Sequence, residues 1–103
     1  MEQKTIAGIT LEFTEEGYLT DSSLWNEDIA KELAKEEDIE LTEKHFQVIN
    51  FIRDKSLSGA TLTIRSVGKS GVTDIKGFYQ LFPGGPLKKA SRIAGIAKPS
   101  SCV

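Results

Sequence analysis

Apolar residues recur at helical spacing in several segments of the chain, and Ser58-Gly59 and Pro83-Gly84-Gly85 mark two of the breaks between those segments. Trp25, Ile29 and Leu33 lie four residues apart, which predicts one apolar stripe of a helix that runs to about Glu36. The polar run 20–23, Thr-Asp-Ser-Ser, offers several oxygens that can cap the first turn of this helix. A stripe of this kind requires a partner, so the chain is expected to bury helix faces against one another.

A second helix is expected to begin after Thr42, as its N-cap, and to run to about Lys55 before Ser58-Gly59 ends it. The lone His45 stands at the edge of its apolar face, which favours a packing role over that of a general base. Segment 61–65, Thr-Leu-Thr-Ile-Arg, is rich in β-branched residues, which predicts either a short strand or an extended connector.

A third helix is expected to follow Ser70-Gly71, with Ser70 as its cap, and to bury a face that holds Ile75, Phe78, Tyr79 and Phe82. Gly68-Lys69-Ser70 resembles the end of a phosphate-binding loop, but Thr63 stands where that loop requires its first glycine. A fourth, short helix is expected to start at Pro86 and to stop at Gly95, which suits a left-handed C-terminal residue.

The N-terminal segment has the alternation of a strand. Ile9, Leu11 and Phe13 alternate with polar residues, and Ala7-Gly8 can turn a hairpin back to residues 5–6. With the helices that follow, this predicts one mainly α domain with a small β-hairpin over residues 1–103, and residues 96–103 as a C-terminal tail.

Composition excludes several classes of protein. One cysteine cannot close a disulfide within the chain, and no cluster with zinc-ligand spacing surrounds the single histidine, so we expect neither metal nor cofactor. No segment approaches the ~20 apolar residues of a membrane span, and the first residues lack the layout of a signal peptide. A cytoplasmic protein is therefore expected.

Charge is distributed unevenly along the chain. Residues 1–45 hold 13 acids and 4 bases, whereas residues 46–103 hold 2 acids and 9 bases. Two interpretations remain open: a positive surface near the C-terminus that attracts an acidic partner or RNA, or basic helices that fold back on acidic ones. A helix-turn-helix that binds nucleic acid is disfavoured, because the second helix offers few bases.

Cys102, the penultimate residue, is the remaining candidate for chemistry. A thiol on a tail serves no packing role, and the thiolate fraction of a free cysteine is strongly nucleophilic. Spacing alone supports a cysteine without a function and a functional cysteine equally.

The C-terminal third resembles the DsrC/TusE family. The resemblance lies in the segments Leu81-Phe82-Pro83-Gly84-Gly85-Pro86, Ile93-Ala94-Gly95, Lys98-Pro99 and Cys102-Val103, and upstream in Ile39 to His45, Gly17-Tyr18-Leu19 and Trp25. It implies an orthogonal helical bundle with an N-terminal β-hairpin and a flexible C-terminal arm that carries the reactive cysteine.

The resemblance also implies a division within the family. In DsrC itself a second cysteine stands eleven positions before the penultimate one, and this chain has Ser91 there. A serine cannot form a persulfide or a disulfide, so the pattern resembles the TusE type, in which the penultimate cysteine carries sulfur alone.

The function that the resemblance implies is a sulfur relay: Cys102 accepts sulfane sulfur as a persulfide from an upstream relay protein and passes it toward tRNA thiolation, as a carrier rather than a stand-alone catalyst. Partner docking is expected to use the basic residues Lys88, Lys89, Arg92 and Lys98. Two alternatives are a partner (gamma) subunit of dissimilatory sulfite reductase and, less favoured, a nucleic-acid-binding regulator.

Overall fold

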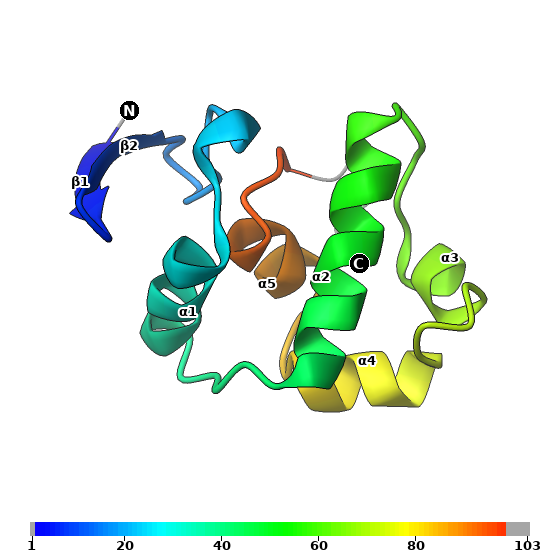
Figure 1. Cartoon of the computed structure of the whole chain (residues 1–103). Coiled ribbons are helices and arrows are strands. Elements are labelled where there is room, and N and C mark those ends of the chain that lie inside the picture. Colours follow the sequence, from blue (N-terminus) through cyan, green and yellow to red (C-terminus); the bar gives the residue numbers. More distant parts are fainter. Residues whose placement is uncertain (1, 99–103) are drawn as a thin grey trace.

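A computed structural model describes residues 2–98 as an N-terminal hairpin, one short 3-10 helix and five α-helices (Figure 1). Strands β1 (Glu2–Ile6) and β2 (Ile9–Phe13) are antiparallel, with Ile6 opposite Ile9 across the predicted turn. Ala7 and Gly8 have φ values of 53° and 78°, the backbone that a two-residue hairpin turn requires. The predicted mainly helical fold with a small β-hairpin is confirmed.

Helix α1 (Glu27–Glu36) begins later than the sequence pattern predicts, although its predicted end is confirmed. Its N-cap is Asn26, whose side-chain oxygen accepts a hydrogen bond from the Ile29 N–H at 2.9 Å. Asn26 has extended backbone, as an N-cap requires, and its short side chain satisfies one of the free N–H groups of the first turn.

The polar run that was expected to cap α1 caps a separate 3-10 turn, η1 (Ser22–Leu24). The Asp21 carboxylate accepts hydrogen bonds from the N–H and the hydroxyl of Ser23, at 3.0 and 2.6 Å. Trp25 follows with extended backbone. The prediction that Trp25 belongs to the stripe of α1 was therefore wrong, because it lies in the link between the two helices.

Helix α2 (Glu43–Leu57) starts after Thr42, as predicted, and ends two residues beyond Lys55. Segment 61–65 forms no strand: residues 61–63 are a connector, as one of the two predicted alternatives has it, but Ile64–Gly68 forms helix α3. Thr63 and Ser66 cap α3 reciprocally: the Thr63 hydroxyl accepts from the Ser66 N–H at 2.9 Å, and the Ser66 hydroxyl accepts from the Thr63 N–H at 3.0 Å. These two bonds outweigh the β preference of the branched residues.

Helix α4 (Ile75–Leu81) also starts later than predicted. Its cap is Asp74, which accepts from the Gly77 N–H at 2.6 Å, whereas the Ser70 hydroxyl donates back to the Val67 carbonyl at the end of α3. The predicted cap at Ser70 was therefore wrong.

The predicted apolar face of α4 is only half buried. Phe78 and Phe82 have no exposed surface, and their rings meet edge to face at 5.8 Å, but Ile75 and Tyr79 remain 46% exposed. Phe78 and Phe82 therefore face the core, whereas Ile75 and Tyr79 lie on the solvent-exposed edge of the predicted face.

Helix α5 (Pro86–Ile93) begins at Pro86, as predicted, and packs against α1, α2 and α4, so it forms the centre of the bundle (Figure 1). Leu87, Ala90 and Ile93 point into the core and are fully buried. Ile96, which the sequence analysis assigned to the tail, is 1% exposed and belongs to this core. None of the helices within residues 2–98 is long and apolar enough to span a bilayer.

Candidate functional site at the end of helix α5

Cys102, the predicted reactive residue, lies outside the described residues. The structure describes the segment to which it is attached, the end of α5 and the chain to Lys98. Because Ile96 is buried while Ala97 and Lys98 are exposed, the chain reaches the surface of the protein directly after Ile96. We call this point the exit of the chain.

A Schellman motif ends α5. The Ile96 N–H donates to the Ser91 carbonyl and the Gly95 N–H donates to the Arg92 carbonyl, both at 3.2 Å. Gly95 takes the left-handed backbone of the motif, with a φ of 68°, as the sequence predicts. The buried Ile96 is the apolar residue that usually accompanies this motif. This backbone geometry ends the helix and turns the chain at Gly95.

Trp25 donates a hydrogen bond to the next carbonyl of α5 that has no partner within the helix. Its indole Nε1–H donates to the Ile93 carbonyl oxygen at 2.8 Å. The indole also lies so close to Gly95 that a Cβ atom there would be 2.4 Å from Trp25 Cδ1, well inside van der Waals contact. Only glycine is compatible with both the left-handed backbone and this contact.

Arg53, in the middle of α2, binds the last carbonyl. Its Nη1 donates to the Ala94 carbonyl at 2.8 Å and to the Ser22 hydroxyl at 3.0 Å, and Nη2 donates to the Ser22 carbonyl at 3.3 Å. The guanidinium lies over the Trp25 ring, 4.2 Å from its centroid. Burial lowers the pKa of the Arg53 guanidinium from its usual value.

Sequence reasoning missed this arrangement. It treated Trp25 as one residue of a helix stripe and Arg53 as one of too few bases for a recognition helix. No local signal could have linked them, because the contact from Trp25 to Ile93 spans 68 positions and that from Arg53 to Ala94 spans 41.

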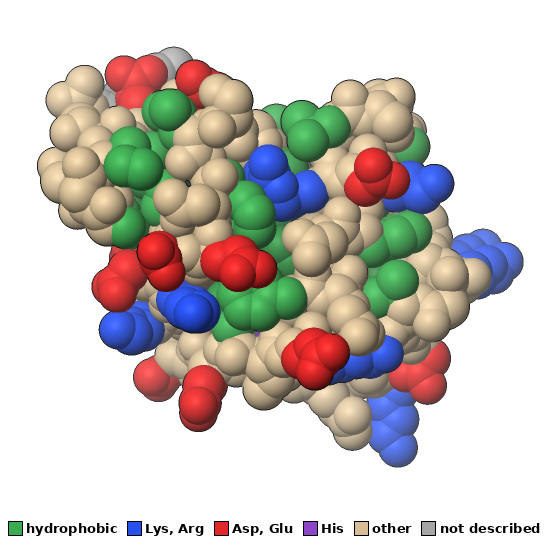
Figure 2. All heavy atoms as spheres, in the orientation of Figure 1, with side chains coloured by type: hydrophobic (Ala, Val, Ile, Leu, Met, Phe, Trp, Pro, Cys, Tyr) green, Lys and Arg blue, Asp and Glu red, His purple; other side chains and the backbone are tan. Residues whose placement is uncertain are grey.

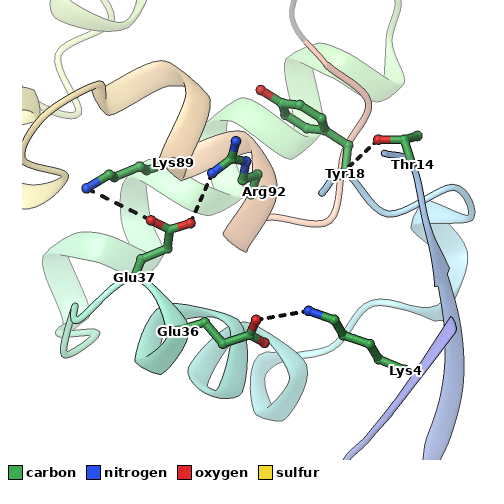
Figure 3. Close-up of polar contacts among 7 residues, drawn as sticks. All are labelled: Lys4, Thr14, Tyr18, Glu36, Glu37, Lys89 and Arg92. Atoms are coloured by element: carbon green, nitrogen blue, oxygen red, sulfur yellow. Dashed lines mark hydrogen bonds and ion pairs between the residues drawn. The ribbon is translucent and has the colours of Figure 1, made fainter. Parts of the chain in front are cut away.

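Two of the predicted docking bases are bound to an acidic residue of the first half. Glu37, just after α1, accepts from Arg92 Nη1 at 3.1 Å and lies 3.9 Å from Lys89 Nζ, so it is held between the two cations (Figure 3). The Lys89 and Arg92 side chains are 26% and 31% exposed. Their contacts with Glu37 are therefore better shielded from solvent than the Lys4–Glu36 ion pair beside them.

The other two predicted bases differ from each other. Lys98 Nζ lies 2.8 Å from a carboxylate oxygen of Glu16, in the loop after β2. This hydrogen bond is the largest cause of a lowered pKa at Glu16. Lys88 is exposed and has no ion pair with any residue between 2 and 98. At three of the four predicted docking positions, the basic side chain is therefore paired with an acidic residue of the first half.

On the face drawn in Figure 2, most acidic side chains lie over the hairpin and α1, whereas basic side chains occur over α1, at the centre and on the side of α3 and α4. A groove of about 200 Å³ between the hairpin and the helices is lined by more acids than bases: the bases are Lys4 and Arg92, and the acids are Glu2, Glu15, Glu16, Glu36 and Glu37. The surface nearest the exit of the chain is thus mixed in charge and largely acidic on the hairpin side.

Ser91, which the resemblance places where DsrC is expected to have its second cysteine, is fully buried on α5. Its hydroxyl has no hydrogen-bond partner among the described residues. The side chain at this position therefore faces the core rather than solvent.

His45 has a packing role, as predicted. Its Nδ1 accepts from the Thr42 N–H at 3.1 Å and its Nε2 lies 2.8 Å from the Leu81 carbonyl, which requires the proton to be on Nε2. The ring also meets Phe82 edge to face at 5.2 Å. Both nitrogens are occupied, so His45 joins the start of α2 to the end of α4. No group of three metal-ligating side chains occurs between residues 2 and 98.

Comparisons with known proteins agree with this geometry. The chain matches the family model described as "DsrC like protein" over residues 5–103. It is 37% identical over 107 residues to the Sulfurtransferase TusE homolog of Haemophilus influenzae, with 95% of this chain and 97% of that protein covered. It is 39% identical over 104 residues to Sulfurtransferase TusE of Escherichia coli, with 93% and 95% covered.

Solved structures show the same fold. The oxidised gamma-subunit of dissimilatory sulfite reductase (DsrC) from Archaeoglobus fulgidus superposes with a TM-score of 0.84 at 35% identity, over 99% of this chain and all of that one. DsrC from Allochromatium vinosum superposes with a TM-score of 0.83 at 34% identity, over 99% and 98% of the two chains. Because the family model matches residues 5–103 and these relatives are more than 30% identical over nearly the whole chain, this chain belongs to the DsrC-like family.

Proposed function

We propose that this protein is a sulfur-relay protein that carries sulfane sulfur as a persulfide on Cys102 and passes it toward formation of 2-thiouridine in tRNA. The observation that supports this most is the likeness, over nearly the full length, to proteins named Sulfurtransferase TusE, in a chain whose single thiol is penultimate. The described fold adds that the chain reaches the surface directly after Ile96, six residues before that thiol.

The chemistry of such a relay needs no redox partner. The Cys102 thiolate attacks the outer sulfur of a donor persulfide, a new S–S bond forms, the donor S–S bond breaks, and the donor leaves as a thiolate. Cys102 then holds a persulfide, whose outer sulfur is attacked in turn by the thiolate of the acceptor. Each step exchanges one S–S bond for another, so no external oxidant or reductant is consumed.

Docking of the donor and the acceptor is assigned, within this proposal, to the basic residues of α5 and the chain after it. Lys88 is the most available, because it is exposed and has no ion pair within residues 2–98. Lys89, Arg92 and Lys98 would have to exchange Glu37 or Glu16 for an acidic group of the partner.

A second candidate is a partner subunit of dissimilatory sulfite reductase, which the superposition on the gamma-subunit from Archaeoglobus fulgidus favours. Ser91 weighs against it. A hydroxyl cannot join Cys102 through sulfur, so a cycle that requires two cysteines in one chain cannot run here. Co-purification with a sirohaem protein would favour this candidate.

The test is sulfur transfer measured by intact mass. The protein and its Cys102→Ser variant are incubated with a persulfide-loaded cysteine desulfurase, and masses are read with and without reductant. We expect a gain of about 32 Da per sulfur atom that reductant removes and that requires Cys102. No gain, while a thiol reagent labels Cys102 readily, would contradict the relay and favour the subunit.

A further inference from the structure

Every open carbonyl at the end of α5 has a donor. A helix leaves its last four C=O groups without partners inside the helix, and an unpaired buried carbonyl is costly. Here the Schellman bonds satisfy two of them, and two side chains from distant segments satisfy the next two: Ser91 from Ile96, Arg92 from Gly95, Ile93 from Trp25 and Ala94 from Arg53.

We propose that Trp25 and Arg53 are positioning residues that fix the point and direction at which the C-terminal arm leaves the protein, and so deliver Cys102 to a protein partner. The fixing of the exit stands on the described contacts alone. Its consequence for sulfur delivery rests on the proposed function.

The two side chains act as one clamp. The guanidinium is stacked on the indole, and each donates to one of two consecutive carbonyls, those of Ile93 and Ala94. Arg53 also holds Ser22 of η1 through two donors, so the clamp ties α2, η1 and the end of α5 together. A cation at a helix C-terminus is further favoured by the helix dipole.

Arginine is the side chain that this position requires. Its planar fork reaches acceptors on two different segments while its face stacks on the indole, whereas a lysine offers one point charge and no planar surface. An apolar residue of the same length would fill the space but would leave the Ala94 carbonyl and the Ser22 hydroxyl without a donor among the described residues. The chemistry of the residue, and not its bulk alone, is therefore used.

The exit matters because the arm is short. Residues 97–103 span at most about 25 Å when fully extended, so a change in the direction of the first residues moves the volume that the thiol can reach. Delivery of a tethered group depends on its effective concentration at the partner, which falls when the tether samples a wider volume. Sulfur transfer from a protein partner therefore depends on the direction of the arm, whereas transfer from a small molecule that diffuses to the thiol does not.

The variants separate the clamp from bulk stability. Trp25→Phe keeps an aromatic ring and removes the N–H donor. Arg53→Lys keeps the charge and removes the fork, and Arg53→Met removes both. The matched control is Arg65→Met, which makes the same charge change at an exposed arginine of α3. Amide spectra establish whether each variant is folded at the temperature used. If Arg53→Met is not folded, Trp25→Phe and Arg53→Lys carry the test.

The first readout does not depend on sulfur chemistry. A nitroxide attached to Cys102, the only thiol, broadens the amide signals that the arm approaches. We expect the clamp variants to spread this broadening over more of the surface than in the original protein, and Arg65→Met to leave it unchanged. The same pattern of broadening in the clamp variants as in the original protein would overturn the proposal.

The second readout compares two donors. We expect sulfur uptake from a persulfide-loaded cysteine desulfurase to fall about tenfold in the clamp variants, as loss of orientation predicts, while uptake from glutathione persulfide stays constant. An equal fall with both donors, or no fall with either, would contradict delivery by the clamp. If the original protein takes no sulfur from the protein donor, the relay proposal fails, and the nitroxide experiment still decides whether the clamp fixes the exit.

Discussion

The hydroxyl of Ser91 is fully buried on α5 and has no hydrogen-bond partner between residues 2 and 98. Burying an unpaired hydroxyl costs about 1–3 kcal/mol, and alanine is the better helix former. We therefore expect Ser91→Ala to raise the free energy of unfolding by about 1 kcal/mol, measured by urea denaturation. The burial also explains why a cysteine is compatible with this position, since a thiol is a weak hydrogen-bond former.

A serine whose hydroxyl is satisfied provides the matched control. Ser70 donates to the Val67 carbonyl at 2.6 Å and accepts from the Val72 N–H at 3.2 Å. Ser70→Ala should lower the free energy of unfolding by about 1 kcal/mol. A loss of stability in Ser91→Ala as large as that in Ser70→Ala would mean that the buried hydroxyl has a partner after all.

Among the elements, the start of α1 depends on one residue. Asn26 caps the helix through the Ile29 N–H, so Asn26→Ala should lower the free energy of unfolding by about 1 kcal/mol. Asn50→Ala is the control, because Asn50 is exposed within α2 and alanine is the better helix former there. Thermal unfolding of the two variants checks this, and equal midpoints would contradict the capping role.

Elements were predictable where the signal was local and single. The hairpin turn, the start of α2 at Thr42 and the start of α5 at Pro86 each rest on one residue or pair with a strong conformational preference. Prediction failed where several capping residues stood in a row, as before α1. It also failed at α3, because the reciprocal bonds between Thr63 and Ser66 overrode the β preference of segment 61–65.

The candidate site was predictable only in part, for a related reason. Cys102 could be proposed because a lone thiol near a chain end stands out in sequence, and its role came from resemblance. The clamp of Trp25 and Arg53 could not, because it joins three segments that are distant along the chain. Tertiary contacts of this kind leave no periodic pattern.

At the scale of the whole molecule, the uneven charge of the chain is partly neutralised by folding. Three of the four basic side chains that follow α4 pair with acids of the first half, Lys89 and Arg92 with Glu37 and Lys98 with Glu16. A partner that docks near the exit therefore competes with internal carboxylates. Binding of such a partner should weaken these ion pairs rather than simply add to them.

The pair between Lys98 and Glu16 makes this measurable by pH. The hydrogen bond from Lys98 holds the pKa of Glu16 below its ordinary value of 4.5, so the contact stabilises the folded protein above that pH and is lost as pH falls through the lowered pKa. Lys98→Met should raise the Glu16 pKa back toward 4.5, followed by the carbon-13 shift of its carboxyl group. Lys88→Met, which removes a charge that acts without a hydrogen bond, should move it less. An unchanged Glu16 pKa in Lys98→Met would show that the base of the arm is not held by this carboxylate in solution.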